Sequence, residues 1–291
     1  MDETAFTVVI DGLYFGEGPR WHDDWLWFSD IKGHKVLRWR PGADLEQIAY
    51  IADDMPSGLG WLPDGRLLVV AVETRRLLRQ EHSGAVVEHA DLSGLCRGIA
   101  NDMIVAANGT AYVDDSGLSS FDVSAERRPG RLLRVTPDGA VQVAAEDLEV
   151  PNGCLLSDDG RTLIVAEAHG GQLTAFDVEP DGGLARRRMF ALPEPAPGRD
   201  RTHPDGICLD AEDAVWVADI RGRRLLRVRE GGEIAESVSF ASYMPIACVL
   251  GGPDRRTLFV CTVTDPGRRL GEVAGNVILA GQVEVPGAGR P

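Results

Sequence analysis

Six positions in the sequence could place side-chain oxygens around one centre. Each opens a short segment of similar character: Glu17-Gly-Pro-Arg-Trp21, Ser57-Gly-Leu-Gly-Trp61, Asn101-Asp-Met-Ile-Val105, Asn152-Gly-Cys-Leu-Leu156, Asp205-Gly-Ile-Cys-Leu209 and Ile246-Ala-Cys-Val-Leu250. Four of these six opening residues carry a carboxylate or a carboxamide. Such oxygen ligands suit a hard divalent cation, Ca²⁺ first, while Mg²⁺, Mn²⁺ or Zn²⁺ would also fit. Water filling a channel is the alternative way to satisfy the same polar groups.

The spacing of these segments predicts how they could converge. Their starts lie 40, 44, 51, 53 and 41 residues apart. Each is followed by a short strand rich in β-branched or aromatic residues: Leu26–Ser29, Leu67–Val70, Ala111–Asp114, Leu163–Ala166, Val215–Ala218 and Leu258–Cys261. A third strand then follows: Lys35–Trp39, Arg76–Arg79, Arg131–Val135, Gln172–Phe176, Arg224–Val228 and Asn276–Leu279. Six such units, separated by Gly- and Pro-containing turns, match the blades of a β-propeller.

The predicted fold is therefore all-β: a six-bladed β-propeller with four antiparallel strands per blade and a central metal-binding channel. Six blades fill residues 1–291 as a single domain. The first strand-like segment, Ala5–Ile10, and the last, Gly281–Val285, are expected to complete one blade and close the ring, which removes open sheet edges. The opening residue of each innermost strand would then point into the mouth of the channel.

Composition narrows the classes of partner. The chain has 30 Lys and Arg against 45 Asp and Glu, a formal charge of −15, which argues against nucleic acid or an anionic membrane surface as partner. No apolar stretch reaches the roughly 18 residues of a membrane helix. The five cysteines form no CxxC pair and mostly lie in apolar runs, so buried thiols and a cytoplasmic location are expected. The oligomeric state stays open.

The motifs also resemble a known family. The run Gly16-Glu-Gly-Pro-Arg-Trp21 is similar to the opening motif of the SMP-30/gluconolactonase/luciferin-regenerating-enzyme (LRE)-like family, and Asn101-Asp102, Pro151-Asn152-Gly153 and Pro204-Asp205-Gly206 fall where its later motifs fall. The resemblance implies a six-bladed propeller with one divalent cation. It further implies Glu17, Asn152 and Asp205 as metal ligands, Asn101 as a substrate contact, and Asp205 also as the general acid/base.

The function that this resemblance implies is metal-dependent hydrolysis of lactones, as in gluconolactonases. Asp102 is a rival for the role of base, although strand alternation predicts that it points away from the face that carries Asn101. Two other functions remain open. One is a phosphotriesterase-type hydrolase on the same scaffold, and the other is a non-catalytic propeller that binds or regulates a partner.

Residues around the predicted mouth bear on the substrate. Members that act on sugar lactones often carry Arg where this chain has Ile99, and an aliphatic side chain cannot hydrogen-bond a polyol. A small lactone or ester less polar than gluconolactone is therefore expected. His169 follows one of the second strands and could contact substrate. The acids Asp30, Asp114, Asp115 and Asp219 end second strands and are expected to bond local backbone groups.

Overall fold

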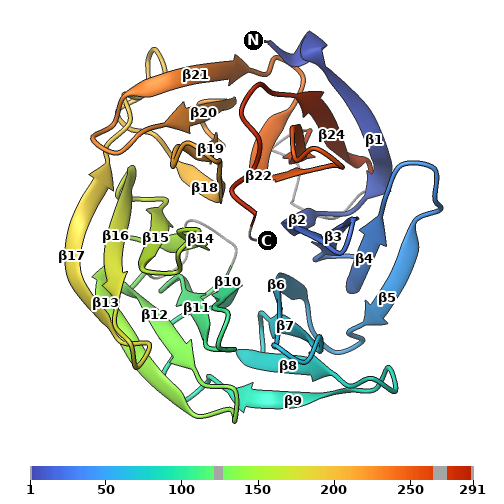
Figure 1. Cartoon of the computed structure of the whole chain (residues 1–291), viewed down its shortest axis with the longest axis vertical. Coiled ribbons are helices and arrows are strands. Elements are labelled where there is room, and N and C mark those ends of the chain that lie inside the picture. The colour runs from blue at the N-terminus through green and yellow to red at the C-terminus, as the bar shows by residue number, and fades with distance from the viewer. Residues whose placement is uncertain (1, 121–126, 265–273, 290–291) are drawn as a thin grey trace.

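The computed structural model describes residues 2–120, 127–264 and 274–289. Within them, six four-stranded antiparallel sheets surround a common centre, so the fold is a six-bladed β-propeller (Figure 1). One 3₁₀ turn, η1 (Glu3–Ala5), precedes the first strand, and no helix in the described part of the chain is long and apolar enough to cross a membrane. The predicted all-β propeller with four strands per blade is confirmed.

The strands follow one another from the centre of each blade outward. The first three blades comprise β2 (Gly16–His22), β3 (Trp25–Asp30), β4 (Lys35–Trp39) and β5 (Glu46–Tyr50); β6 (Pro56–Trp61), β7 (Leu67–Ala71), β8 (Arg76–Gln80) and β9 (Val86–Asp91); β10 (Ala100–Val105), β11 (Ala111–Asp115), β12 (Gly130–Val135) and β13 (Val141–Leu148). Blades four to six comprise β14 (Pro151–Leu156), β15 (Thr162–Glu167), β16 (Gln172–Val178) and β17 (Leu184–Ala191); β18 (Pro204–Leu209), β19 (Val215–Asp219), β20 (Arg224–Val228) and β21 (Ile234–Ser239); β22 (Met244–Gly251), β23 (Thr257–Val263), β24 (Asn276–Gln282) and β1 (Phe6–Leu13).

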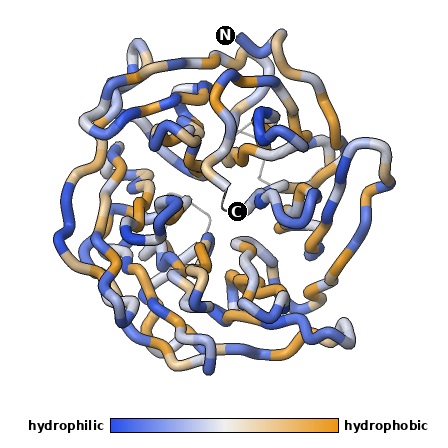
Figure 2. The backbone as a smooth tube through the Cα atoms, in the orientation of Figure 1, coloured by the Kyte–Doolittle hydropathy of each residue, from blue (hydrophilic) through white to orange (hydrophobic). Residues whose placement is uncertain are grey.

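The core lies between neighbouring blades. Every residue of β7 and of β19 is buried, because these second strands are covered by a blade on each face. Such strands have continuous apolar runs instead of alternating ones. The outermost strands face solvent on one side, so β5 and β9 mix buried and exposed residues, and Figure 2 shows both hydropathy colours along the outer rim.

The six innermost strands β2, β6, β10, β14, β18 and β22 neighbour one another in a closed ring. We call the end where they begin the mouth end and the end where they finish the far end. Each inner strand carries a β-bulge close to its start. In blade four, for example, Pro151 pairs with Glu167 but Cys154 pairs with Val165, so three steps on β14 match two on β15. A bulge changes the direction of the side chains around it.

The two ends of the chain complete the ring. β1 pairs with β24, with Phe6 opposite Gly281 and Leu13 opposite Asn276, which confirms the expected closure of the last blade by the first strand. The segment after β24 then turns inward to the centre (Figure 1). There the Ala211 N–H donates to the carbonyl of Pro286 at 2.8 Å, and the Ala288 N–H donates to that of Leu209 at 3.2 Å.

Removing residues 1–13 should destabilise the protein strongly and leave β24 as an open edge. The deletion exposes partners of Phe6, Ile10 and Leu13, which are 8, 5 and 3% exposed, and burial of such side chains contributes about 1.5–3 kcal/mol each. Thermal unfolding and light scattering should show a lower Tm and aggregation. Removing residues 1–5 alone, which keeps β1, is the control. A 1–13 deletion that stays monodisperse with a wild-type Tm would show that β1 is dispensable.

Candidate metal and catalytic site

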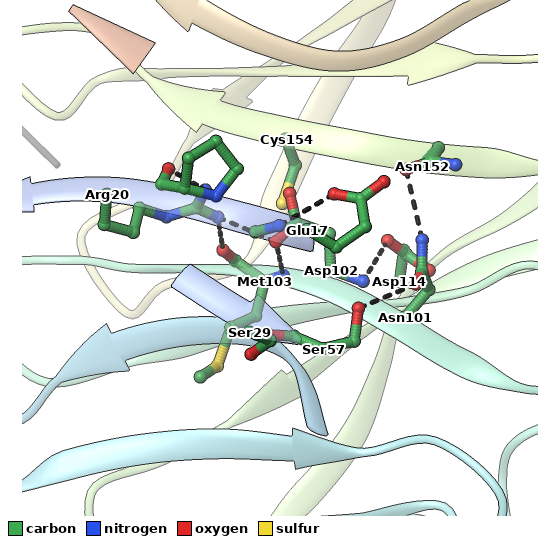
Figure 3. A network of polar contacts seen from close by, with 12 residues as sticks. Glu17, Arg20, Ser29, Ser57, Asn101, Asp102, Met103, Asp114, Asn152 and Cys154 are labelled. Carbon is green, nitrogen blue, oxygen red and sulfur yellow. Dashed lines mark hydrogen bonds and ion pairs between the residues drawn. The ribbon is translucent and has the colours of Figure 1, made fainter. Parts of the chain in front are cut away.

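The predicted site residues lie together at the mouth end of the inner strands. Glu17, Ser57, Asn101, Asn152 and Asp205 each occupy the second position of an inner strand, and Ile246 occupies the third. We call these six residues the ring. Neighbouring members contact one another directly: the Ser57 hydroxyl donates to Asn101 Oδ1 at 2.8 Å, and Asn101 Nδ2 donates to Asn152 Oδ1 at 3.1 Å (Figure 3). The repeat in the sequence therefore located residues that are up to 51 positions apart but adjacent in space.

The two carboxylates of the ring influence each other. Glu17 is buried, and Asp205 is half-buried with its Oδ1 shut off from solvent. Glu17 is 8% exposed and accepts a hydrogen bond from the Gly18 N–H at 2.7 Å. Burial raises the pKa of Glu17 well above its ordinary value, and the charge of Asp205 raises it further. Burial likewise raises the pKa of Asp205 to about 7, with a further contribution from the charge of Asp102. Three carboxyl groups from three blades thus share one poorly solvated region.

These groups fit a hard divalent cation. Asp205 Oδ1 is shut off from solvent and has no hydrogen-bond partner in the structure. The donors that the ring offers beside it are the Glu17 carboxylate and the amide oxygen of Asn152. In the described part of the chain, no group of three or more His, Cys, Asp or Glu side chains is arranged to hold a metal ion. A cation would therefore depend on a mixed set of carboxylate and amide oxygens, which suits Ca²⁺.

Small residues after the ring positions let the inner strands approach closely. A Cβ atom on Gly153 would lie 2.6 Å from the Asp205 carbonyl oxygen, and one on Gly58 would lie 2.6 Å from the backbone nitrogen of Met103. Real Cβ atoms do not come so close to backbone atoms. Glycine is thus required between Asn152 and the neighbouring strand, and this contact fixes how near Asn152 and Asp205 lie.

In blade three, Asp102 stands where Gly18, Gly58, Gly153 and Gly206 stand in other blades. Its Oδ1 forms an ion pair with Arg20 Nη2 at 2.7 Å, and the two side chains are 11% and 7% exposed (Figure 3). The prediction that Asp102 points away from the site assumed regular alternation. The bulge between Ala100 and Met103 breaks that alternation, and the charge of Asp102 raises the pKa values of both Glu17 and Asp205.

Arg20 was missed as a site residue, although a signal for it exists. Its Nη2 also donates to the Met103 carbonyl at 2.6 Å, while its Nη1 donates to the Pro19 carbonyl at 2.9 Å. A buried acid at a position otherwise held by glycine needs a cationic partner. Arg20 is the basic residue of the first motif, but it is the fifth residue of β2 whereas Asp102 is the third of β10, so the repeat alone does not pair them.

Buried acids at the ends of second strands hold the backbone that leads into the ring. Asp30 accepts from the Phe15 N–H at 2.7 Å, Asp115 from the Gly98 N–H at 2.8 Å and Asp219 from the His203 N–H at 2.9 Å. The expected backbone-bonding role of these three acids is confirmed. Asp114 also bonds backbone, accepting from the Asp102 N–H at 2.8 Å, but its Oδ1 is buried without a partner, and burial raises its pKa.

Ile99 and His169 lie outside the ring. Ile99 is 8% exposed and packs with Ile31, Met55 and Val72 in an apolar cluster at the mouth end. His169 is half-buried in the turn after β15, where its Nδ1 contacts Arg127 Nη1 and its N–H donates to the Glu149 carbonyl at 3.1 Å. Burial lowers the pKa of His169, and the charge of Arg127 lowers it further. Substrate contact by either residue stays a prediction.

Replacing Asp205 by Asn should stabilise the metal-free protein at pH 8. The folded-state pKa of Asp205 is raised from 3.8 to about 7, so ionisation lowers the free energy of unfolding as the pH rises through this interval. The uncharged amide avoids this loss and should gain up to about 4 kcal/mol in the free energy of unfolding at pH 8 but little at pH 4. Urea unfolding of chelator-treated protein at both pH values measures this. The control is Asp219→Asn, which loses an ion pair with Arg224 and should be destabilising at pH 8; equal destabilisation by both would contradict the electrostatic account.

Comparison with known proteins places this arrangement in a family. A profile described as "SMP-30/Gluconolactonase/LRE-like region" matches residues 15–264. The chain is 30% identical to a 6-deoxy-6-sulfogluconolactonase of Pseudomonas putida, with 100% of this chain and 99% of that protein covered. It is 27% identical to regucalcin of Xenopus laevis, covering 89% and 86%. The crystal structure of a calcium-binding protein, regucalcin, from Agrobacterium tumefaciens superimposes with a TM-score of 0.79 at 20% identity, covering 96% and 94%. The chain belongs to the SMP-30/gluconolactonase/LRE-like family.

Proposed function

We propose that this protein is a divalent-metal-dependent lactonase that opens a small lactone ring. The observation that carries the proposal is the buried oxygen ring, in which one carboxylate oxygen of Asp205 has no partner. A binding platform would have no need for two poorly solvated carboxylates beside two amides. The full-length similarity to a 6-deoxy-6-sulfogluconolactonase supports lactone chemistry in particular.

Glu17, Asn152 and Asp205 are the proposed ligands of one cation, with Ca²⁺ the first choice and Zn²⁺, Mn²⁺ or Mg²⁺ as alternatives. Burial first and the charges of neighbouring acids second raise the pKa values of Glu17 and Asp205, and a divalent cation would offset both effects. A cation bound there would supply Lewis-acid polarisation of the lactone carbonyl. The similarity of this chain to regucalcins, of which the Agrobacterium tumefaciens protein is a calcium-binding protein, supports Ca²⁺.

The side chains have distinct tasks in this reaction. Asn101 is fixed on one side by Ser57 and on the other by Asn152, so it presents its amide in one orientation to the substrate. Asp205 takes the proton from the attacking water and returns it to the leaving alkoxide. Asp102 is the weaker candidate for this role, because its Oδ1 is occupied by Arg20 and by the Met103 N–H.

The residues at the mouth favour a substrate less polar than a sugar lactone. Ile99 belongs to a packed apolar cluster with Met55 and Val72 and offers no hydrogen bond to a hydroxyl group. A desolvated hydroxyl without a partner costs ~1–3 kcal/mol. His169 lies in the turn after β15 of blade four, beside Arg127, and is the proposed polar contact of the substrate.

The direct test is a panel of lactones against a panel of phosphotriesters. Chelated protein would be supplied with Ca²⁺, Zn²⁺ or Mn²⁺ in turn, and hydrolysis would be followed by release of acid. Lactone hydrolysis that depends on the added cation supports the proposal. Cation-dependent cleavage of phosphotriesters alone would favour the phosphotriesterase alternative, and activity on neither panel would favour a binding or regulatory module.

Glu17→Gln should abolish tight cation binding. The substitution removes one of the two negative charges among the proposed ligands. Asp205 would then be the one charged ligand, beside neutral amide oxygens. Elemental analysis after dialysis should show no retained metal, and added cation should no longer raise the Tm, because it stabilises only a state to which it binds. Ser57→Ala, a ring residue with no proposed ligand role, is the control that keeps its metal. A Glu17→Gln protein with full metal content would exclude Glu17 as a ligand.

Ile99→Arg should move the substrate preference toward gluconolactone. The wild type is expected to prefer alkyl γ- or δ-lactones, and the guanidinium would add donors for sugar hydroxyls. The ratio of kcat/KM for gluconolactone to that for an alkyl lactone of equal ring size should rise roughly tenfold, the effect of about one hydrogen bond. Ile99→Met keeps the apolar cluster and should leave the ratio unchanged. A wild type that strongly prefers gluconolactone would overturn this assignment and leave the metal site untouched.

A further inference from the structure

Four basic side chains lie at the mouth end of blades three to five. They are Arg127, in the segment between β11 and β12; His169, in the turn between β15 and β16; Arg201, just before β18; and Arg221, in the turn between β19 and β20. The three arginines are exposed and the histidine is half-buried, so solvent reaches this part of the surface. We call these four residues the basic cluster. The proposed hydrolysis gives a task only to His169.

Hydrogen bonds hold the segments that carry the basic cluster against one another. Arg201 Nη1 donates to the His169 carbonyl at 2.8 Å, and Arg127 Nη1 contacts His169 Nδ1. In blade five, the Ile220 N–H donates to the His203 carbonyl at 3.2 Å, which holds the turn between β19 and β20 against the segment that leads into β18. Segments from three neighbouring blades therefore meet at one place.

The same segments lead directly into the ring. β15 ends at Glu167, which pairs with Pro151, the residue before Asn152. His203 lies two residues before Asp205 in the chain. The basic cluster is therefore separated by only a few residues from two of the three proposed cation ligands. A substrate held at the ring meets this charged surface on the side of blades four and five.

The contact with Arg127 fixes which nitrogen of His169 carries the proton. A guanidinium has only N–H donors, so His169 Nδ1 accepts and the proton of the neutral ring lies on Nε2. Burial lowers the pKa of His169, and the charges of Arg127 and Arg221 lower it further, which keeps the ring uncharged at neutral pH. The basic cluster thus offers one neutral N–H donor among three guanidinium groups.

The acids near the basic cluster do not neutralise it. Asp200 pairs with Arg201 at 3.2 Å, and Glu149 adds one opposing charge. Neither Arg127 nor Arg221 has an ion-pair partner among the acids that the structure describes. Three arginines thus stand against two acids. A local positive excess in a chain of formal charge −15 is a surface that attracts an anion.

The donors of the basic cluster suit an anionic oxygen group. The planar fork of a guanidinium matches the paired oxygens of a carboxylate, sulfonate or phosphate, and its hydrogen bonds to such groups are about twice as strong as those between neutral partners. A hydroxyl group can accept from the same donors, but it leaves the positive excess unbalanced. The charge therefore selects an anion over a polyol.

We propose that the substrate is a lactone with an anionic side group, and that Arg127, His169 and Arg221 bind this group. The inference rests on the proposed lactonase activity, to which it adds a requirement for charge. It agrees with the expected preference for an apolar ring, because the apolar cluster that contains Ile99 comes from blades one to three and the basic cluster from blades three to five. The substrate would present its apolar part to the first and its anionic group to the second.

Two lactones that differ only in charge test the inference. One is a γ-lactone with a propanoate side chain on its ring, and the other is the primary amide of the same compound. The acid should have a kcat/KM at least about tenfold higher than that of the amide, and the difference should shrink as NaCl is added, because salt screens exposed charges. Equal kcat/KM values for the two lactones would overturn the inference and leave the lactonase proposal standing.

Variants locate the group that binds the anion. Arg127→Gln and Arg221→Gln should each lower the ratio of kcat/KM for the acid to that for the amide at least about threefold, as expected for an exposed charge pair, and the double variant should bring the ratio close to that of no preference. Arg161→Gln, in the turn between β14 and β15 at the far end, removes the same charge and should keep the wild-type ratio. A double variant with the wild-type ratio would overturn the assignment, and thermal melts check that each variant is folded.

Hydrolysis of neither lactone would contradict the lactonase proposal, and binding then decides the inference by itself. The γ-lactams with the same acid and amide side chains keep the shape and charge of the lactones but are far more resistant to hydrolysis. In calorimetric titration of the cation-loaded protein, the acid lactam should bind at least about tenfold more tightly than the amide lactam, and Arg221→Gln should reduce this difference. Equal binding, or no binding of the acid lactam, would overturn the inference.

Discussion

In several blades, a buried carboxylate accepts hydrogen bonds from the backbone just before the inner strand. These bonds position the start of the strand, and the site depends on that position. Asp30, Asp115 and Asp219 end the second strands of blades one, three and five, and each accepts from a residue two or three positions before a ring member. Glu167 does the same in blade four, accepting from the Glu149 N–H at 2.7 Å. Hydrogen bonds to an ionised acceptor are about twice as strong as neutral ones. The backbone next to the ring residues is therefore held by the second strands of the same blades. This support does not require a bound ligand and does not depend on the loops at the mouth.

The same ring concentrates negative charge that the protein alone does not neutralise. Glu17, Asp102 and Asp205 approach one another, and Arg20 is paired with only one of them. Burial of like charges lowers stability, which is the usual compromise at sites selected for function. A bound divalent cation would remove this repulsion. This repulsion is the physical reason for the proposed cation, and it follows from the charge and burial of these three acids alone.

The predictable parts of the fold are those that depend on the order of residue types within a short segment. Turns followed by apolar β-branched runs identified the second and third strands, and alignment of the repeats located the ring residues. The outermost strands such as β5 and β9 were not located, because half of their residues face solvent and their pattern resembles that of polar loops. The sequence also does not show the bulges, because a residue is extra only relative to the strand with which its own strand pairs. This is why regular alternation misplaced Asp102, and why its ion pair with Arg20, 82 positions away, was missed.

Arg20 and Asp102 separate two environments along one set of strands. Toward the mouth, the inner strands present carboxylate and amide oxygens, and toward the far end they present leucine, isoleucine and aromatic side chains. At this boundary Arg20 Nη2 forms an ion pair with Asp102 Oδ1 at 2.7 Å. The guanidinium also donates to the carbonyls of Pro19 and Met103, at 2.9 and 2.6 Å. These contacts join β2 of blade one to β10 of blade three, so the side chain of Arg20 holds the two strands at the level where the polar mouth gives way to the apolar far end.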